Sequence, residues 1–334
     1  MCIYLKEVQS IMATQAAQTR LLGRSGIEVS PLGLGCWAIG GPIFRDDKQT
    51  GWGDVDDDES IRAIHAGLDM GVTFLDTADV YGAGHSEQVV ARALKGKRDG
   101  VVLATKFGNQ FDERTRMAGG RDASPKYIRS ACDASLRRLD TDRIDLYQLH
   151  IGDLEVAQAD DVIGVLEDLV QAGKILSYGW STDDPERAAT FARGEHCAAI
   201  QQRLNVFEGA HETLAVCERE NLASLNRGPL GMGLLTGKFD SNSSIPETDV
   251  RGGWNFKEGD VAERLRKLDA VREVLTSDGR TLAQGALGWL WARSERTVPI
   301  PGFKSVAQVE ENVGAMRFGP LSPEQMQQIE ELSA

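Results

Sequence analysis

Four side chains that can hold or move a proton follow short apolar runs of the sequence. Asp76 follows VTFL, Lys106 follows VVLAT, His150 follows IDLYQL, and Tyr81 lies five residues after Asp76. A phenol can donate a proton to a developing alkoxide, and a nearby ammonium is expected to stabilise the phenolate and lower the pKa of that phenol. A carboxylate would keep the ammonium charged, and an imidazole could position a carbonyl oxygen or help to move the proton. These four side chains can polarise and protonate a carbonyl but cannot reduce it, so a cofactor must supply the electrons.

Each of these four residues also has an ordinary structural interpretation. Asp76 could cap the next turn, and Lys106 could be a solvated charge. Tyr81 could pack beneath a loop, and His150 could be a hydrogen-bonded core histidine. Because polar residues at strand ends are common, the structural interpretation is favoured for any one of them alone. Their convergence on one face of the fold would reverse that preference.

The elements that must position these residues alternate between β-rich runs and amphipathic helices. The strands are expected at residues 31–37, 72–78, 101–106, 143–150, 175–181, 196–201, 221–228 and 296–302. The clearest helices are expected at residues 59–71, 86–94, 124–139, 159–174, 185–193, 209–219 and 305–316. Repeated strand–helix units require a parallel sheet, because a parallel connection needs a crossover.

We therefore predict the α/β class, as one (β/α)8 TIM barrel over residues 20–334 with an N-terminal β-hairpin and extra C-terminal helices. The hairpin is expected around Arg24-Ser25-Gly26, and residues 1–19 are expected to form a flexible extension. A doubly wound open sheet is the alternative, because periodicity does not distinguish an open sheet from a closed one. In a barrel the carboxyl ends of the strands share one face, so Asp76, Lys106 and His150 should meet there.

Composition restricts the class of partner. The chain has 334 residues with 50 acidic against 37 basic side chains, a formal charge of -13, so nucleic acid and anionic membranes are poor partners. An anionic ligand would need a few well-placed lysines or arginines. The five cysteines form no C-x-x-C pair and are odd in number, which predicts reduced thiols and a cytoplasmic location. No apolar stretch approaches the length of a membrane span.

Several local patterns suggest other sites, but their contexts do not fit. Gly33, Gly35 and Ala38 match G-x-G-x-x-A, yet Gly-Gly-Pro follows at once and no helix can begin there to face a pyrophosphate. The run GLLTGKF around Lys238 lacks the first glycine and the Ser or Thr of a P-loop. His211 is followed by a glutamate but by no second histidine at metalloprotease spacing, and no metal site is predicted.

Five longer segments carry a family resemblance that extends from about Arg20 to the end of the chain. They are FLDTADVYGAGHSE, LATKFG, DLYQLH, GPLGMGLLTGKF and PIPGFKSVAQVEENV. At these spacings the sequence resembles the aldo-keto reductases, in their long-loop bacterial branch. The resemblance implies a catalytic tetrad of Asp76, Tyr81, Lys106 and His150. It also implies NADPH-dependent reduction of small aldehydes or ketones, or the reverse reaction on a sugar or polyol, with NADH less favoured.

The resemblance also implies where the cofactor binds. Around the nicotinamide it places Cys36, Trp37, Ser181, Thr182, Gln201 and Arg227. Along the phosphates it places Gly228, Pro229, Leu230, Met232, Lys238 and Arg251. Around the adenosine 2′-phosphate and the adenine it places Gly302, Lys304, Ser305, Gln308, Glu311 and Asn312.

Three of these positions depart from the pattern of the family. Thr182 stands where the family usually has an asparagine, and Arg227 stands where a tyrosine commonly stacks on the nicotinamide. Arg227 therefore puts a cation beside that ring. Lys304 stands where the family often has an arginine. Its ammonium is a point charge that lacks the bidentate geometry of a guanidinium, so the residue favours NADP over NAD but does not decide between them.

The sequence alone is compatible with other functions. A barrel of this family could resemble a regulatory subunit that binds the nucleotide and turns over little. A lyase or isomerase that forms a Schiff base on Lys106 would leave PGFKS unexplained. Trp37, Phe44 and Trp52 could form an aromatic wall of the substrate pocket. The expected partner is a small carbonyl compound or polyol, and the chain is expected to be a monomer or a weak homo-oligomer.

Overall fold

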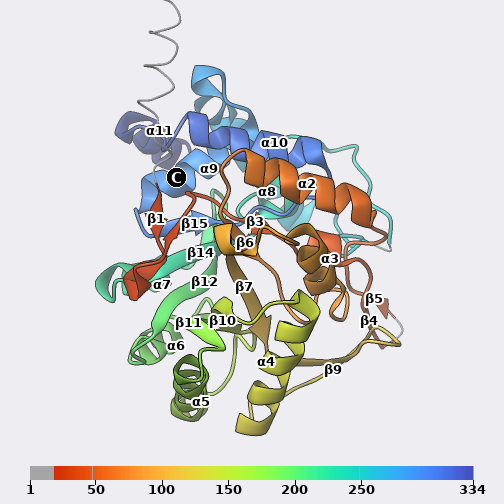
Figure 1. Cartoon of the computed structure of the whole chain (residues 1–334). Helices are drawn as coiled ribbons and strands as arrows, with labels where there is room; N and C mark the ends of the chain where they lie inside the picture. The colour runs from red at the N-terminus through yellow and green to blue at the C-terminus, as the bar shows by residue number, and fades with distance from the viewer. Residues whose placement is uncertain (1–18, 47, 248, 334) are drawn as a thin grey trace, which may run out of the picture.

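A parallel sheet that follows chain order forms the centre of the molecule (Figure 1). The computed structural model describes residues 19–333 except 47 and 248. Within these residues the sheet comprises β3 (Leu34–Gly35), β6 (Phe74–Asp76), β7 (Val102–Phe107), β10 (Ile144–Leu149), β11 (Ile175–Ser181), β12 (Cys197–Asn205), β14 (Ala223–Arg227) and β15 (Thr297–Pro299). Each strand pairs in parallel with the next one in this order.

The sheet closes where its first strand meets the chain around its last strand. The Gly33 amide donates to the Pro299 carbonyl at 2.9 Å, and the Gly35 amide donates to the Pro301 carbonyl at 3.0 Å. Gly35 also forms a parallel bridge with Gly302. A Cβ on Gly35 would lie 2.5 Å from the Ile300 carbonyl oxygen, so the close approach requires glycine. The predicted barrel is confirmed, and the alternative of an open doubly wound sheet is wrong.

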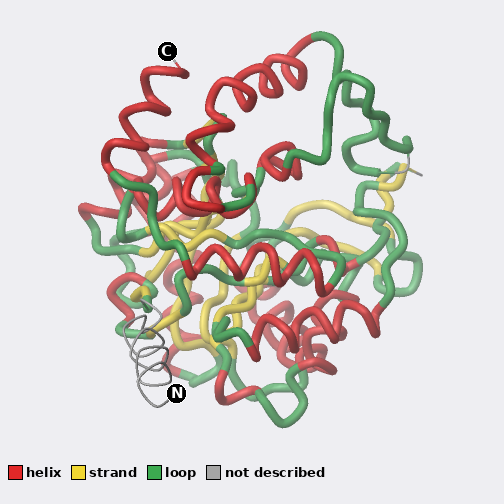
Figure 2. The backbone as a smooth tube through the Cα atoms, turned by 90° about the horizontal axis from the view of Figure 1, so that it is seen from above, coloured by secondary structure: helices red, strands yellow, loops and turns green. Residues whose placement is uncertain are grey.

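Helices form the outer layer around the strands (Figure 2). Those described are α2 (Asp57–Asp69), α3 (His85–Ala93), α4 (Pro125–Leu139), α5 (Ala159–Gln171), α6 (Pro185–Phe191), α7 (His211–Arg219), α8 (Gly259–Leu275), α9 (Leu282–Arg293), α10 (Val306–Gly314) and α11 (Pro323–Ser333). Capping side chains and prolines mark where several of these helices begin. Ser124 accepts a hydrogen bond from the Tyr127 amide, and Pro125 occupies the first turn of α4. None of the helices in the described ranges is both long and apolar enough to cross a membrane.

The predicted N-terminal hairpin closes the end of the barrel at which the strands begin. It consists of β1 (Arg20–Leu21) and β2 (Glu28–Val29), paired antiparallel. Leu22 and Val29 are buried among apolar side chains of the barrel strands. Arg24 donates from Nε to the carbonyl of Cys197, the first residue of β12, at 2.9 Å. With this end covered, access to the barrel is from the carboxyl ends of the strands. The predicted extension over residues 1–19 falls, except for Thr19, outside the described residues.

Two small hairpins near the mouth of the barrel were not predicted. β4 (Phe44–Arg45) pairs with β5 (Lys48–Gln49), and β8 (Asn109–Asp112) pairs with β9 (Met117–Arg121). The two hairpins join through Phe44 and Met117 into one sheet. The sequence does not indicate β4 and β5, because strands of two residues are too short to show alternation. A further short strand, β13 (Glu208–Gly209), pairs with the end of β12.

Candidate active site

The four proton-handling side chains predicted from the sequence meet at the open end of the barrel. Asp76 ends β6, Lys106 lies near the end of β7, His150 directly follows β10, and Tyr81 lies on the loop between β6 and α3. Asp76, Tyr81 and His150 line a cavity of about 820 Å³, and Lys106 lies buried beneath them. Because all four side chains lie together, a shared functional role is favoured over the separate structural interpretations of the single residues.

Lys106 uses all three of its ammonium protons inside the protein. Its Nζ donates to Asp76 Oδ1 at 2.6 Å, to the Thr77 carbonyl oxygen at 2.7 Å and to Tyr81 Oη at 3.2 Å. Burial acts to lower the pKa of Lys106, but Asp76 and Tyr81 outweigh it, and the net pKa is raised. Lys106 therefore remains a cation, which disfavours the neutral amine that a Schiff-base mechanism needs.

Tyr81 has a hydroxyl hydrogen that its protein partner leaves free. Tyr81 Oη accepts from the ammonium of Lys106, and an ammonium cannot accept in return. The hydroxyl can therefore donate to an acceptor placed in the cavity. The predicted lowering of the pKa is wrong in its net sign. Burial raises the pKa of Tyr81, and the opposing effect of Lys106 does not cancel it. At neutral pH the side chain is a protonated donor.

Asp76 is held by two amide side chains that fix its second oxygen. Asp76 Oδ2 accepts from Gln148 Nε2 at 3.0 Å and from Gln201 Nε2 at 2.9 Å. Gln201 Nε2 also donates to Gln148 Oε1 at 3.2 Å, so both amide hydrogens of Gln201 are used and only its oxygen remains for a ligand. Gln148 was not among the predicted site residues. The alternation of side chains along β10, which puts Gln148 and His150 on one face, was the signal that could have found it.

His150 is a neutral side chain at the edge of the cavity. Burial lowers its pKa from 6.5 to about 3, and the nearby cations Lys106 and Arg227 act in the same direction. Its Nδ1 is buried and has no hydrogen-bond partner among the described residues. Its ring lies edge-on to Tyr81, with the centroids 5.9 Å apart. Of the two roles expected for His150, the geometry favours orienting an oxygen over carrying a second proton.

The lowered pKa of His150 predicts a specific acid sensitivity. Between pH 6.5 and about 3 the unfolded chain binds a proton at His150 that the folded chain does not, so the free energy of unfolding falls as pH falls through this window. His150→Asn should remove this contribution and flatten the acid side of the stability curve, measured by urea unfolding at a series of pH values. An unchanged slope in His150→Asn would contradict the assignment.

All but two of the residues predicted to contact a cofactor line the same cavity. The exceptions are Thr182 and Ser305, whose hydroxyls serve local structure. Thr182 Oγ1 donates to the Gly152 carbonyl at 2.9 Å and accepts from the Asp184 amide at 3.2 Å. Ser305 caps α10 by accepting from the Gln308 amide. The structure thus places these two side chains outside the cavity lining, where the Thr182 hydroxyl donates and accepts locally and the Ser305 oxygen accepts from the first turn of α10.

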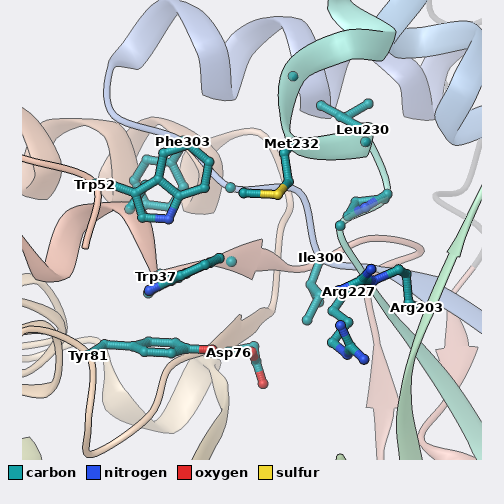
Figure 3. Close-up of a pocket in the computed structure, with 18 of the residues that line it drawn as sticks. Trp37, Trp52, Asp76, Tyr81, Arg203, Arg227, Leu230, Met232, Ile300 and Phe303 are labelled. Carbon is teal, nitrogen blue, oxygen red and sulfur yellow. The ribbon is translucent and has the colours of Figure 1, made fainter. Parts of the chain in front are cut away.

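Arg227 is held in the wall of the cavity by a carboxylate that the sequence analysis did not consider. Its Nη2 donates to Asp183 Oδ2, and Asp183 Oδ1 accepts from the Arg203 amide at 2.6 Å. Burial lowers the pKa of Arg227, while Asp183 opposes the change. Figure 3 shows Arg227 and Arg203 across the cavity from the rings of Trp37 and Tyr81.

The three predicted phosphate ligands gather in another part of the cavity wall. Arg251 forms two hydrogen bonds of 2.8 Å with the carboxylate of Asp249. Lys304 Nζ donates to two neutral acceptors, the carbonyl oxygens of Trp52 at 2.9 Å and Asp54 at 3.0 Å.

Lys238, the third cation, forms no hydrogen bond or ion pair with any described residue. Burial lowers its pKa, and Arg251 adds to the effect. The cluster therefore holds three cations, with the carboxylates of Asp249 and Asp54 nearby, in a protein whose overall charge is -13. This local excess of positive charge suits an anionic ligand.

Aromatic rings separate the catalytic group from this cationic cluster. The ring of Trp37 stacks on Tyr81, with centroids 6.1 Å apart and planes at 29° (Figure 3). Trp52 meets Trp37 edge to face at 5.3 Å, and the guanidinium of Arg251 lies 4.7 Å from a ring of Trp52. Trp37 and Trp52 line the cavity as expected, whereas Phe44, predicted with them, does not.

The carboxyl end of this closed (β/α)8 barrel holds a tyrosine, a buried lysine–aspartate pair and a neutral histidine. This arrangement is suited to proton transfer. Comparison with known proteins places it further. The model of the Aldo/keto reductase family matches residues 31–334, and the chain belongs to this family.

Individual relatives agree with the family assignment over most of their length. Aldo-keto reductase YhdN from Bacillus subtilis is 34% identical over 292 residues, which cover 86% of this chain and 85% of that protein. The glycerol dehydrogenase AKR11B4 from Gluconobacter oxydans has a solved structure with a TM-score of 0.81 and 33% identity, covering 95% of each chain. An aldo/keto reductase from Klebsiella pneumoniae, solved with NADP and acetate, has a TM-score of 0.69 and 27% identity, covering 94% and 95%.

Proposed function

We propose that this protein is an NADP(H)-dependent oxidoreductase that reduces small aldehydes or ketones to alcohols, or runs the reverse reaction on a polyol. The observation that carries the proposal is the hydrogen bond from Lys106 to Tyr81 Oη, which leaves the phenolic hydrogen free for a substrate oxygen. The polyol direction is included because the relative from Gluconobacter oxydans is a glycerol dehydrogenase.

In the reductive direction Tyr81 acts as the general acid. The substrate oxygen lies between Tyr81 and His150, and the neutral imidazole orients it without competing for the proton. When bound, NADPH supplies the hydride that reduces the carbonyl carbon. Tyr81 transfers its proton to the oxygen as negative charge develops there, and the ammonium of Lys106 stabilises the phenolate that remains. Asp76 balances the charge of Lys106 throughout.

The cavity offers groups that fit each end of NADP. Gln201 presents only an acceptor oxygen, which suits the NH2 of a carboxamide. Lys238, which forms no hydrogen bond or ion pair with a described residue, suits phosphate groups together with Arg251 and Lys304. We place the 2′-phosphate at Lys304, whose Nζ donates to two backbone carbonyls and to no carboxylate among the described residues. The NADP bound to the Klebsiella pneumoniae relative supports this choice of cofactor.

The test is a titration of NADPH and NADH, followed by turnover of a panel of aldehydes, ketones and polyols. Lys304→Glu should weaken NADPH binding by about 100-fold and leave NADH binding within about threefold, because it reverses a charge that only the 2′-phosphate contacts. Lys304→Met loses the same two hydrogen bonds without reversing the charge, and it should weaken NADPH by about tenfold.

Controls separate this site from general charge effects. Lys126→Glu makes the same change on the exposed surface of α4 and should alter neither affinity. Equal losses for NADPH and NADH in Lys304→Glu would contradict the phosphate assignment. Tight NADPH binding with no turnover on any substrate would instead favour a nucleotide-binding regulatory role.

The surroundings of the cysteines support the proposed cellular location. Cys36, Cys132, Cys197 and Cys217 are buried free thiols in the described chain. Burial raises the pKa of Cys132 to about 12, so its reactive thiolate is rare at neutral pH. We propose a cytoplasmic enzyme that acts as a monomer or a weak homo-oligomer on small-molecule substrates.

A further inference from the structure

His85 connects the loop that carries Tyr81 to two other segments through both of its ring nitrogens. It is the first residue of α3 and lies four residues after Tyr81. Its Nδ1 is 3.0 Å from the carbonyl oxygen of Gly40, and its Nε2 is 3.2 Å from the carboxylate of Asp57 on α2. Only 19% of the His85 side chain is exposed, so both contacts are largely shielded from water.

The two partners of His85 both present hydrogen-bond acceptors to its ring. A backbone carbonyl and a carboxylate only accept hydrogen bonds, whereas a neutral imidazole has one N–H to donate. Each ring nitrogen of His85 therefore faces an acceptor, one on the backbone and one on α2. Beside this pair, Arg92 donates from Nη1 to Asp57 at 2.8 Å and from Nη2 to Asp58 at 3.4 Å. Asp57 is thus held between the imidazole of His85 and the guanidinium of Arg92.

The Gly40 carbonyl held by His85 also packs against the backbone beside Tyr81. A Cβ on Gly82, whose φ is +60°, would lie 1.8 Å from the Gly40 oxygen. A Cβ on Gly40 would lie 2.9 Å from the carbonyl carbon of Tyr81. The two backbones thus touch with no side chain between them. The short turn Ala38–Gly40 follows Trp37, whose ring stacks on Tyr81, so one contact fixes both rings.

We propose that His85 is a positioning residue for Tyr81, because it bridges Asp57 of α2 to the Gly40 carbonyl that packs against the catalytic loop. His85, Gly40 and Asp57 do not line the cavity, whereas Trp37 and Tyr81, whose rings the bridge positions, do. Loss of the bridge should therefore move the phenol relative to the substrate while it leaves the cationic cluster for the phosphates in place. The kinetic consequence rests on the proposed carbonyl reduction, whereas the structural consequence does not.

The test compares His85→Leu with His196→Leu. His196 is a matched control, because its Nδ1 also contacts a carboxylate, that of Glu167 at 2.6 Å. His196 directly precedes β12 and therefore lies at the opposite end of the barrel. His85→Leu should lower kcat about tenfold and leave the Kd of NADPH within twofold, because a small misplacement of a reacting group has a large effect on rate. His196→Leu should leave kcat unchanged. His85→Gln, which keeps one donor, should fall between His85→Leu and wild type.

Hydrogen exchange tests the His85 bridge without any measurement of turnover. In His85→Leu the amides of residues 38–40 and 81–86 should exchange faster than in wild type, while those of β7 and β10 keep their rates. If the wild type reduced no carbonyl compound, the proposed function would fail, and faster exchange at these two segments would still support the bridge. Unchanged exchange and unchanged kcat in both His85 variants would overturn it, as would an equal loss of kcat in His196→Leu.

Discussion

Tyr81→Phe is expected to reduce kcat for carbonyl reduction by about 10²–10⁴-fold, the usual contribution of a positioned general acid. Phenylalanine keeps the ring that stacks on Trp37 and meets His150 edge-on, and it removes only the hydroxyl. Lys106 loses one of its three acceptors but keeps Asp76 and the Thr77 carbonyl. The variant should therefore fold and bind NADPH with wild-type affinity, and fail at the transfer of the proton.

Tyr147→Phe is the matched control for this experiment. The Tyr147 hydroxyl is buried without a hydrogen-bond partner in the described chain, and its ring stacks on Phe107 away from the cavity. Its removal should change neither kcat nor the Kd of NADPH. Turnover is measured by the oxidation of NADPH with a reactive aldehyde, and affinity by quenching of tryptophan fluorescence. A Tyr81→Phe protein that keeps more than about a tenth of wild-type kcat would show that another group donates the proton.

The positions of the tetrad could be predicted because strand ends in a parallel barrel share one face. Asp76, Lys106 and His150 each follow an apolar run, so alternation and run length were enough to place them together. The hydrogen-bond partners do not follow from strand ends. Gln148 lies inside its strand, where only the face that it shares with His150 marks it, and Asp183 meets Arg227 only through the pairing of distant strands.

The pKa of Tyr81 shows a second limit of sequence reasoning. The sequence indicates that a cation accompanies the phenol, and this effect is present with the expected sign. It gives no measure of burial, which acts on Tyr81 in the opposite direction and is larger. His150 behaves consistently, since burial and two cations all favour the neutral ring. The direction in which neighbouring charges shift a pKa could thus be predicted from the residues. The net shift, and with it the protonation state, also depends on burial and required the fold.

Lys106→Met is expected to lower both activity and stability. Methionine removes the ammonium that pairs with Asp76, which is 2% exposed and then keeps, among the described residues, the two amide donors of Gln148 and Gln201. Breaking a buried ion pair on one side costs about 3–5 kcal/mol of unfolding free energy, because the remaining charge has no counterion. Urea unfolding measures this cost. Lys174→Met, which breaks a half-exposed pair with Asp133, should cost less than about 1 kcal/mol.

A second substitution separates the two roles of Lys106. In Lys106→Met with Asp76→Asn, position 76 no longer carries a charge that needs a counterion, and the amide can still accept from Gln148 and Gln201. Most of the lost stability should return, because the penalty belongs to the uncompensated charge. Activity should not return, because Tyr81 has lost the ammonium that stabilises its phenolate. Recovery of both together would mean that Lys106 serves folding alone, and recovery of neither would mean that its packing exceeds its charge in importance.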